Sequence, residues 1–276
     1  MLPLTAWPDA DKRHIFGVFT DIDDTLTTEG AITDDALSAL AKLKEAGCHV
    51  IAITGRPVGW STPFARSWPV DAIVAENGAV ALVREMAHSP HGEVPIGLRR
   101  LYQQSTATRE ANFQRMQAVA ARVLREVPGS TMAQDSPGRE TDIAIDHSEF
   151  SHLSVEQIAR VVAIMQSEGM SATVSSIHVN GWYGAHNKLE GARWIVRELL
   201  GRDLDRERGR WAYVGDSTND QKMFEAFEHS IGVANIQRFL PDLTHLPRYV
   251  TLAERGAGFA QVASALLQAR PLATGT

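Results

Sequence analysis

Two short acidic runs carry the residues best suited to chemistry. The first, DIDDT at residues 21–25, directly follows the apolar run 15–20. In an extended chain, residues two apart point the same way, so the carboxylates of Asp21 and Asp23 can converge while Asp24 is turned elsewhere. Such neighbours repel each other unless a divalent cation lies between them or one stays protonated. Either state would serve phosphoryl transfer, and a simple turn or helix cap is the alternative explanation.

The second run, GDSTND at residues 215–220, follows another apolar stretch. Asp216 and Asp220 are four residues apart, so a helix that starts promptly would place both carboxylates on one face. Carboxylate and carbonyl oxygens are the ligands that Mg²⁺ prefers. This run therefore predicts a cation site, with simple helix capping by Asp216 or Ser217 as the alternative.

Two further positions could bind an anion. Thr54 and Gly55 offer a hydroxyl and a backbone that can approach a phosphate closely, and Lys188 stands at the start of an expected helix. An exposed helical lysine is the commoner role for a residue like Lys188. The combination is more specific than its parts, because four pieces of a phosphate and Mg²⁺ site occur in order along the chain.

The elements that must position these residues alternate between strand and helix. Short apolar runs predict buried strands at 15–20, 49–54, 72–75, 211–215 and 230–233, and helical spacing predicts helices at 33–47 (capped by Thr33), 57–67, 187–200 and 219–227. This alternation favours an α/β fold with a doubly wound parallel sheet. Ligands of such sheets bind at the carboxyl ends of the strands, where both acidic runs lie.

Between residues 84 and 182 the pattern changes to a separate α+β module. Helices are expected at 108–126 and 154–169, and strands at 142–146 and 173–180. We therefore expect residues 1–83 and 183–276 to form a catalytic core and residues 84–182 to form an inserted cap domain.

Composition excludes several function classes. The 27 Lys and Arg residues against 33 Asp and Glu residues give a net charge of −6, which argues against nucleic-acid and anionic-membrane partners. Apolar runs are too short to span a bilayer, and no secretory leader is recognisable. Cys48 is the only cysteine, so no internal disulfide can form, and a reducing cytoplasm is expected. The sequence leaves the oligomeric state open.

In these motifs the chain resembles the haloacid dehalogenase superfamily of phosphatases, and specifically its Cof-type branch, subfamily IIB. The runs at 21–25, 53–56, 187–188 and 215–220 are similar to its four motifs, and this branch also carries an inserted cap. Sucrose-phosphate and mannosyl-3-phosphoglycerate phosphatases and phosphomannomutases are relatives in it. The family most often has Gly where this chain has Asp24, so an extra charge enters the expected metal site.

The resemblance implies a role for each motif residue. Asp21 would be the nucleophile that forms an aspartyl-phosphate, and Asp23 would be the general acid and base. The implied Mg²⁺ ligands are Asp21, the carbonyl oxygen of Asp23, and Asp216, with Asp220 and Asn219 close by. The implied phosphate-binding residues are Thr54, Gly55, Lys188 and Asn219.

The cap would supply contacts to the leaving group. The candidates are Arg139, Glu140, His178, Asn180 and Trp182, although packing between the two modules would also explain His178 and Trp182. The expected activity is hydrolysis of a small sugar phosphate or a related phosphate by an Mg²⁺-dependent phosphomonoesterase. Two alternatives stay open, a phosphomutase of the phosphomannomutase type and a non-catalytic phospho-binding module.

Overall fold

The computed structural model describes residues 1–89 and 92–270, and the chain divides into two compact units. The first unit comprises Met1–Ile53, Ser67–Ile73 and Ile195–Thr276, and the second comprises Thr54–Arg66 and Val74–Trp194. Three elements run from one unit into the other: α3 (Val58–Ser67), β6 (Ala72–Ala75) and α6 (Lys188–Leu200). The cap bounds expected from the sequence, 84–182, stay a prediction.

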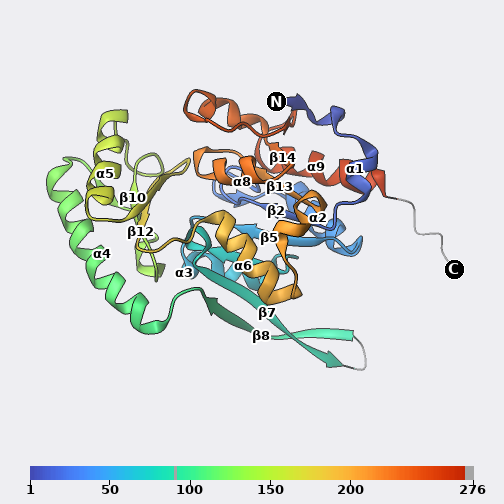
Figure 1. The fold of residues 1–276 in the computed structure, drawn as a ribbon, viewed down its shortest axis with the longest axis horizontal. Coiled ribbons are helices and arrows are strands. Elements are labelled where there is room, and N and C mark those ends of the chain that lie inside the picture. Colours follow the sequence, from blue (N-terminus) through green and yellow to red (C-terminus); the bar gives the residue numbers. More distant parts are fainter. Residues whose placement is uncertain (90–91, 271–276) are drawn as a thin grey trace. The chain divides into compact units, whose positions relative to one another are not determined.

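The first unit is built on a parallel sheet (Figure 1). Its strands lie in the order β1-β15-β14-β13-β2-β5, and every neighbouring pair in this series is parallel. They are β1 (Leu2–Pro3), β2 (Gly17–Thr20), β5 (His49–Ile53), β13 (Trp211–Gly215), β14 (His229–Gly232) and β15 (Tyr249–Val250). The prediction of an α/β fold with a parallel sheet is confirmed.

The centre of this sheet is apolar on both faces. All four residues of β2 and all five of β13 are buried, as expected for strands covered on both sides. Phe19 stacks on Trp211 with ring centroids 4.6 Å apart, and Phe227 contacts Phe19 edge-on at 5.7 Å. Gly17 makes this packing possible, because a Cβ there would lie 2.2 Å from the Trp211 ring.

Helices lie between these strands and after the last of them. They are α1 (Asp9–Arg13), α2 (Asp34–Glu45), α7 (Leu204–Glu207), α8 (Gln221–Ala226) and α9 (Arg255–Ala269), with a small two-stranded sheet of β3 (Thr27–Thr28) and β4 (Ala31–Ile32) after β2. Helices α2 and α9 pack against each other. Short 3₁₀ turns span Leu4–Ala6, Arg208–Arg210, Thr218–Asp220 and Ala234–Asp242.

Two local predictions in this unit were wrong in detail. Thr33 precedes α2, but its side chain makes no capping hydrogen bond there; instead, an oxygen of Asp35 accepts from the Ala36 N–H at 2.9 Å. The helix expected at 219–227 begins only at Gln221, after the 3₁₀ turn Thr218–Asp220. This turn lets Asp220 fold back on the backbone that precedes it.

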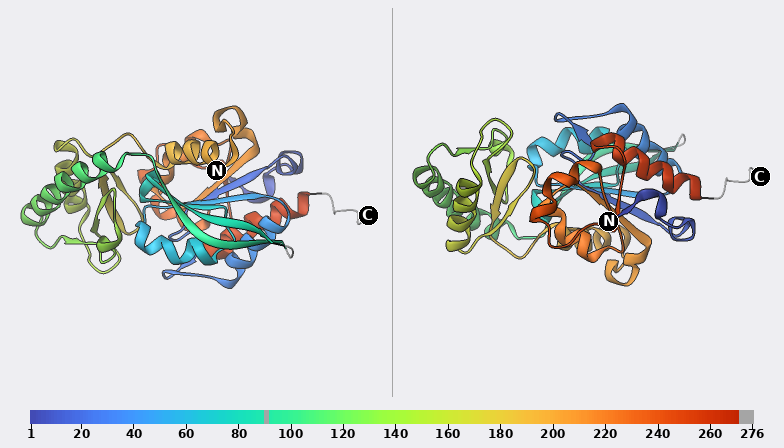
Figure 2. Two further views of the ribbon diagram at one scale, coloured as in Figure 1. Left: turned by 90° about the horizontal axis from the view of Figure 1, so that it is seen from below. Right: turned by 90° about the horizontal axis from the view of Figure 1, so that it is seen from above.

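The second unit contains a long hairpin and a separate sheet. The hairpin consists of β7 (Val80–Ser89) and β8 (Gly92–Tyr102), and the sheet has the order β11-β12-β10-β9. Its strands are β9 (Thr131–Met132), β10 (Ile143–Asp146), β11 (Ser171–Val174) and β12 (His178–Trp182). Helices α4 (Thr106–Glu126) and α5 (Val155–Ser167) cover one face of this sheet (Figure 2). Further 3₁₀ turns span Glu76–Gly78 and Ser136–Gly138.

Sequence reasoning found the helices of this unit better than its strands. The α5 helix begins with a capping box in which Ser154 and Gln157 exchange hydrogen bonds. The single strand expected at 173–180 is wrong, because β11 and β12 are two antiparallel strands joined by a turn. The β7–β8 hairpin was not predicted. Among the residues that the structure describes, no helix has the length and apolarity needed to cross a membrane.

Replacing Gly17 by Ala should destabilise the sheet that carries the first acidic run. The new methyl group would overlap the Trp211 ring, and overpacking of this kind typically costs about 1–3 kcal/mol. Thermal unfolding monitored by circular dichroism should show a lower Tm. The matched control is Gly209→Ala, where the nearest atom to a Cβ is an oxygen of Glu228 at 3.9 Å; equal Tm values for the two variants would contradict the packing argument.

Candidate active site

The first unit brings its acids together because of strand order. Asp21 directly follows β2 and Asp216 directly follows β13, and these two strands are parallel neighbours. The Asp21 N–H extends the ladder between them by donating to the carbonyl oxygen of Val214 at 2.9 Å. The carboxyl ends of adjacent parallel strands meet at the same edge of the sheet. Both acids are therefore held at that edge.

Asp21, Asp216 and Asp220 form a compact buried cluster. One carboxylate oxygen from each lies within 4.8 Å of the others, and the three residues are 4%, 0% and 0% exposed. Hard oxygen donors of this kind fit Mg²⁺ or a similar cation. A cation bound among them would offset the repulsion between these carboxylates.

Asp220 also shapes the loop that carries Asp216. One of its oxygens accepts hydrogen bonds from the backbone N–H groups of Asp216 at 2.9 Å and Ser217 at 3.1 Å. Its other oxygen accepts from the hydroxyl of Tyr213. Burial, together with the charge of Asp220, raises the pKa of Tyr213, so this hydroxyl keeps its proton and remains a donor. Asp220 therefore fixes the backbone from which the Asp216 side chain extends.

Neutral donors hold the side chain of Asp216. The Thr25 hydroxyl donates to one of its oxygens at 3.4 Å, and the side-chain amide of Asn235 donates to the other at 3.0 Å. The same amide donates to the backbone carbonyl of Asp24 at 3.0 Å. Asn235 thus links the two acidic runs within the first unit.

The remaining motif residues of this unit lie close in sequence to the cluster. Asp23 is half-buried, and the three-carboxylate cluster does not include its side chain. Because its expected contact to a cation is through the backbone carbonyl, that contact stays a prediction. Asn219 accepts a hydrogen bond from the Ser217 hydroxyl at 2.9 Å, and its role toward phosphate is likewise untested.

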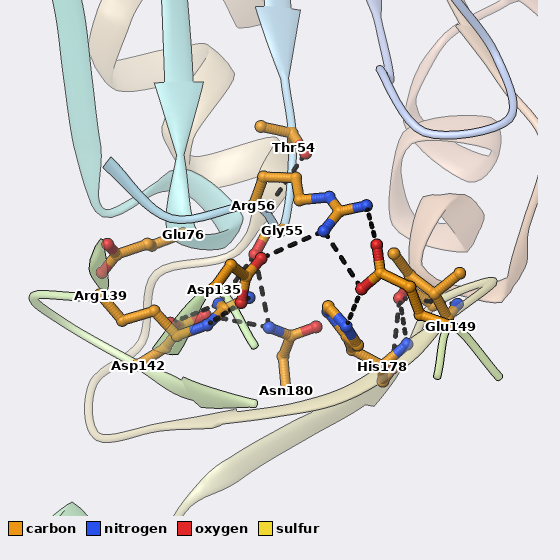
Figure 3. A network of polar contacts seen from close by, with 12 residues as sticks. Thr54, Gly55, Arg56, Glu76, Asp135, Arg139, Asp142, Glu149, His178 and Asn180 are labelled. Carbon is orange, nitrogen blue, oxygen red and sulfur yellow. Dashed lines mark hydrogen bonds and ion pairs between the residues drawn. The ribbon is translucent and has the colours of Figure 1, made fainter. Parts of the chain in front are cut away.

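In the second unit, the loop 54–56 belongs to a polar network (Figure 3). The Thr54 hydroxyl accepts from the Arg56 N–H at 3.0 Å, and the Thr54 carbonyl accepts from the Asn77 N–H at 2.9 Å. The carbonyl oxygen of Gly55 accepts from the guanidinium of Arg139 at 3.0 Å and from the amide of Asn180 at 3.4 Å. Two of the expected leaving-group residues therefore touch the backbone of this loop.

Arg139 is buried, and all of its nitrogens are engaged inside the protein. Besides Gly55 it contacts Asp142 at 2.7 Å and Asp135 at 3.0 and 3.2 Å. Burial raises the pKa of Asp142 to about 7, although the charge of Arg139 acts in the opposite direction. Asn180 donates to the other oxygen of Asp142 at 3.1 Å. A direct contact of Arg139 or Asn180 with substrate stays a prediction.

Arg56 is the second cation of this network. Its guanidinium pairs with Glu149 at 2.8 Å and with Asp135 at 3.2 Å. The imidazole of His178 contacts the same Glu149 carboxylate at 2.8 Å. Burial alone would raise the pKa of Glu149, but the hydrogen bonds from His178 and Arg56 outweigh it and lower this pKa to about 2. Glu149 therefore stays ionised across the physiological range.

Two other acids support this network. Asp146 accepts four backbone N–H bonds from residues 148–151, at 2.8 to 3.1 Å, and so shapes the loop that presents Glu149. Glu76 is fully buried and accepts from the Val58 N–H at 3.1 Å and from the backbone and hydroxyl of Thr141, both at 2.5 Å. Burial raises the pKa of Glu76.

The structure also bears on three other candidates. Glu140 pairs with Arg100 at 2.9 Å and accepts from the Tyr102 hydroxyl at 2.7 Å. Trp182 packs in the apolar core of the second unit, and a contact of its side chain with substrate stays a prediction. Lys188 is 3% exposed, so the alternative of an ordinary exposed helical lysine is wrong.

Part of this chain matches a known protein family. Residues 18–93 match the family of haloacid dehalogenase-like hydrolases. The family resemblance drawn from the motifs is confirmed. Within the match lie β2, the first acidic run and the loop 54–56. A comparison with the curated proteins finds no match to this sequence.

Solved structures of haloacid dehalogenase-like hydrolases share the fold over nearly the whole chain. A Plasmodium vivax protein assigned to the HAD/COF-like hydrolases is 15% identical and covers 95% of this chain and 99% of its own, with a TM-score of 0.66. The sucrose-phosphatase from Synechocystis, solved with sucrose and phosphate, is 14% identical over 92% and 98%, with a TM-score of 0.61. A haloacid dehalogenase-like hydrolase from Bacteroides thetaiotaomicron is 14% identical over 91% and 98%, with a TM-score of 0.62.

Several residues of these clusters were not found from the sequence. Asn235, Asp135, Asp142 and Glu149 are single polar residues without motif spacing, and their partners are mostly distant in sequence. The local signal for Asp142 and Asp146 was their place at the two ends of a predicted buried strand.

Replacing Asp142 by Asn should change how stability depends on pH. Because the folded-state pKa of Asp142 lies above its ordinary value of 3.8, its stabilising contribution is complete below pH 3.8 and is lost as the pH rises through about 7. The variant lacks this titration. Its free energy of unfolding relative to that of the parent should therefore rise between pH 3.8 and about 7, by at most about 4 kcal/mol.

Urea unfolding at a series of pH values between 4 and 8 would measure this effect. Asp242→Asn removes an exposed acid outside this network and is the matched control. Parallel curves for the Asp142 variant and the parent would show that Asp142 titrates normally in the folded protein.

Proposed function

We propose that this chain is a divalent-cation-dependent phosphomonoesterase that hydrolyses a small sugar phosphate through an aspartyl-phosphate. The observation that carries the proposal is the buried cluster of Asp21, Asp216 and Asp220 at the ends of neighbouring strands in a haloacid dehalogenase-like fold. Few other chemistries require three carboxylates so close together.

In the proposed first step, a carboxylate oxygen of Asp21 attacks the phosphorus atom in line with the leaving oxygen. Asp23 gives its proton to that oxygen as the P–O bond breaks, so that the alcohol leaves neutral. In the second step, Asp23 takes a proton from water while the water oxygen attacks the aspartyl-phosphate. The second step releases inorganic phosphate and returns Asp21 and Asp23 to their starting states.

The residues that would hold a cation are Asp21, Asp216 and the carbonyl oxygen of Asp23, with Asp220 beside them. When bound, Mg²⁺ would offset the repulsion between the nucleophile and a dianionic phosphate. The contribution of the chain is to hold Asp216 in one orientation through Thr25 and Asn235, and to fix its backbone through Asp220.

The proposal assigns Thr54, Gly55, Lys188 and Asn219 to the equatorial phosphate oxygens. Lys188 is buried, and an ammonium beside a phosphate in transfer would stabilise the charge that spreads over these oxygens. The hydrogen bond from the Arg56 N–H to the Thr54 hydroxyl fixes one rotamer of Thr54.

The proposed substrate class is supported by the fold neighbours. One is a sucrose-phosphatase solved with sucrose and phosphate, and another is described as related to trehalose-6-phosphate phosphatase. We assign leaving-group recognition to the α+β module 84–182, with Arg139, Glu140, His178 and Asn180 as its polar candidates. The proposed location is the cytoplasm, in keeping with a single buried cysteine.

Replacing Asp21 by Asn should abolish turnover, because the amide cannot act as the nucleophile. We expect kcat to fall by at least about a thousandfold, with folding retained. Phosphate release from a panel of sugar, glycerate, nucleotide and cofactor phosphates would measure it, and Asp34→Asn, at an exposed helix position, is the matched control. Activity of the Asp21 variant above a trace would remove Asp21 from the role of nucleophile.

Chelation of divalent cations should stop phosphate release, and added Mg²⁺ should restore it. Ca²⁺ should restore little, because it favours a larger and looser coordination shell. Full activity in the presence of excess EDTA would contradict the metal assignment.

Quantifying the products also tests the reaction class. One inorganic phosphate per alcohol supports hydrolysis, whereas an isomerised sugar phosphate would establish a mutase.

A further inference from the structure

Asp24 occupies a backbone conformation that few side chains adopt. Its φ angle is 53°, in the left-handed region that favours Gly and, among other residues, tolerates Asn and Asp best. It also adds a third acid to the first acidic run, three residues after Asp21. Both features carry an energetic cost, so the contacts of this side chain need an explanation.

Two arginines from distant parts of the first unit converge on Asp24. Arg238, in the 3₁₀ segment Ala234–Asp242, places a guanidinium nitrogen 3.2 Å from one oxygen of Asp24. Arg255, the first residue of α9, places its Nε 3.0 Å from the other oxygen. Asp24 thus faces one cation on each of its two oxygens.

Arg238 also faces Asp216, a proposed cation ligand. The same guanidinium nitrogen lies 3.7 Å from an oxygen of Asp216, slightly farther than from Asp24. Asn235 fixes this arrangement, because its amide donates to Asp216 and to the Asp24 carbonyl, and its oxygen accepts from the Arg255 N–H at 2.9 Å. One guanidinium is therefore shared between two carboxylates.

This sharing affects cation binding, since a guanidinium beside Asp216 competes with a metal ion for the same negative charge. Among the described residues, Arg238 faces two carboxylates. Its guanidinium nitrogen lies 3.2 Å from Asp24 and 3.7 Å from Asp216, so Asp24 is the closer of the two. Without the charge of Asp24, Arg238 would pair with Asp216 alone. Its half-exposed position leaves it free to make that move.

We propose that Asp24 is a positioning residue that holds Arg238 off Asp216 and so keeps Asp216 available to the divalent cation. The inference rests on the proposed function, because it assumes a cation at the Asp21, Asp216 and Asp220 cluster. It gives a role to the acid that stands where the family most often has Gly.

A double-mutant cycle of Mg²⁺ affinity, measured by titration calorimetry on the full chain, tests the proposal. Asp24→Asn keeps the left-handed backbone and removes the charge, and it should weaken Mg²⁺ binding by about three- to tenfold. Arg238→Gln should bind Mg²⁺ at least as tightly as the parent. In the Arg238→Gln background, adding Asp24→Asn should weaken binding by less than about twofold, because the competing cation is gone.

Arg255→Gln is the matched control. Like Arg238→Gln, this variant removes one arginine charge that faces Asp24. The acidic partner of Arg255 among the described residues is Asp24 and not Asp216. The loss caused by Asp24→Asn should therefore persist in the Arg255→Gln background. Circular dichroism spectra of all variants would confirm that each one is folded.

Other outcomes separate the possible failures. An equal loss of affinity in the parent and Arg238→Gln backgrounds would mean that Asp24 acts only by its own charge, and it would overturn the proposal. No loss in either background would overturn it as well. If the parent chain itself binds no Mg²⁺, the metal assignment under the proposed function fails first, and the role of Asp24 fails with it.

Discussion

The repulsion between three buried carboxylates is the constraint on which the first unit depends. Asp21, Asp216 and Asp220 would separate in an unsupported loop, because water would solvate each of them better than the protein interior does. Here they are fixed by two strands whose residues are all buried, and by donors placed around them. The apolar packing of Phe19 in β2 against Trp211 in β13 thus contributes stability that offsets the cost of burying the acids.

The second unit also contains buried acids, but there they lie beside arginines. Two arginines, Arg56 and Arg139, lie among three carboxylates, those of Asp135, Asp142 and Glu149, and both arginines contact Asp135. Buried ion pairs contribute little net stability, but breaking one leaves an uncompensated charge. Such a network therefore defines one conformation of the loop 54–56 more than it strengthens the fold, and a loop that positions a reacting group needs a single conformation.

Much of the fold could be predicted from the sequence because its signals are local. The strand Trp211–Gly215 is a short apolar run between polar residues, and the alternation of such runs with helical segments leaves few topologies. The β7–β8 hairpin was missed because the sequence of β8 contains Pro95 and Gly97, residue types that usually interrupt a strand. The 173–180 segment was read as one strand because its turn contains no Gly or Pro.

The motif residues of the candidate site could also be predicted, because their sequence signals are local. Most of the residues that contact them could not. Asp21 and Asp216 follow recognisable strands, so their meeting required only the rule of parallel sheets. The contacts of Asn235 with Asp216 and of Glu149 with Arg56 join residues far apart in sequence, and no local pattern encodes them. Asp24 was noticed as a departure from a pattern, but only the structure reveals its two arginines.

By accepting from four backbone N–H groups, the side chain of Asp146 holds the backbone of the loop 147–151 in one shape. Residues such as Phe150, which is 64% exposed, can then be exchanged without altering the path of the chain. A segment of this kind is a natural place for divergence between related enzymes, and a practical one for engineering a new preference, because a single buried acid preserves its geometry while its outward surface varies.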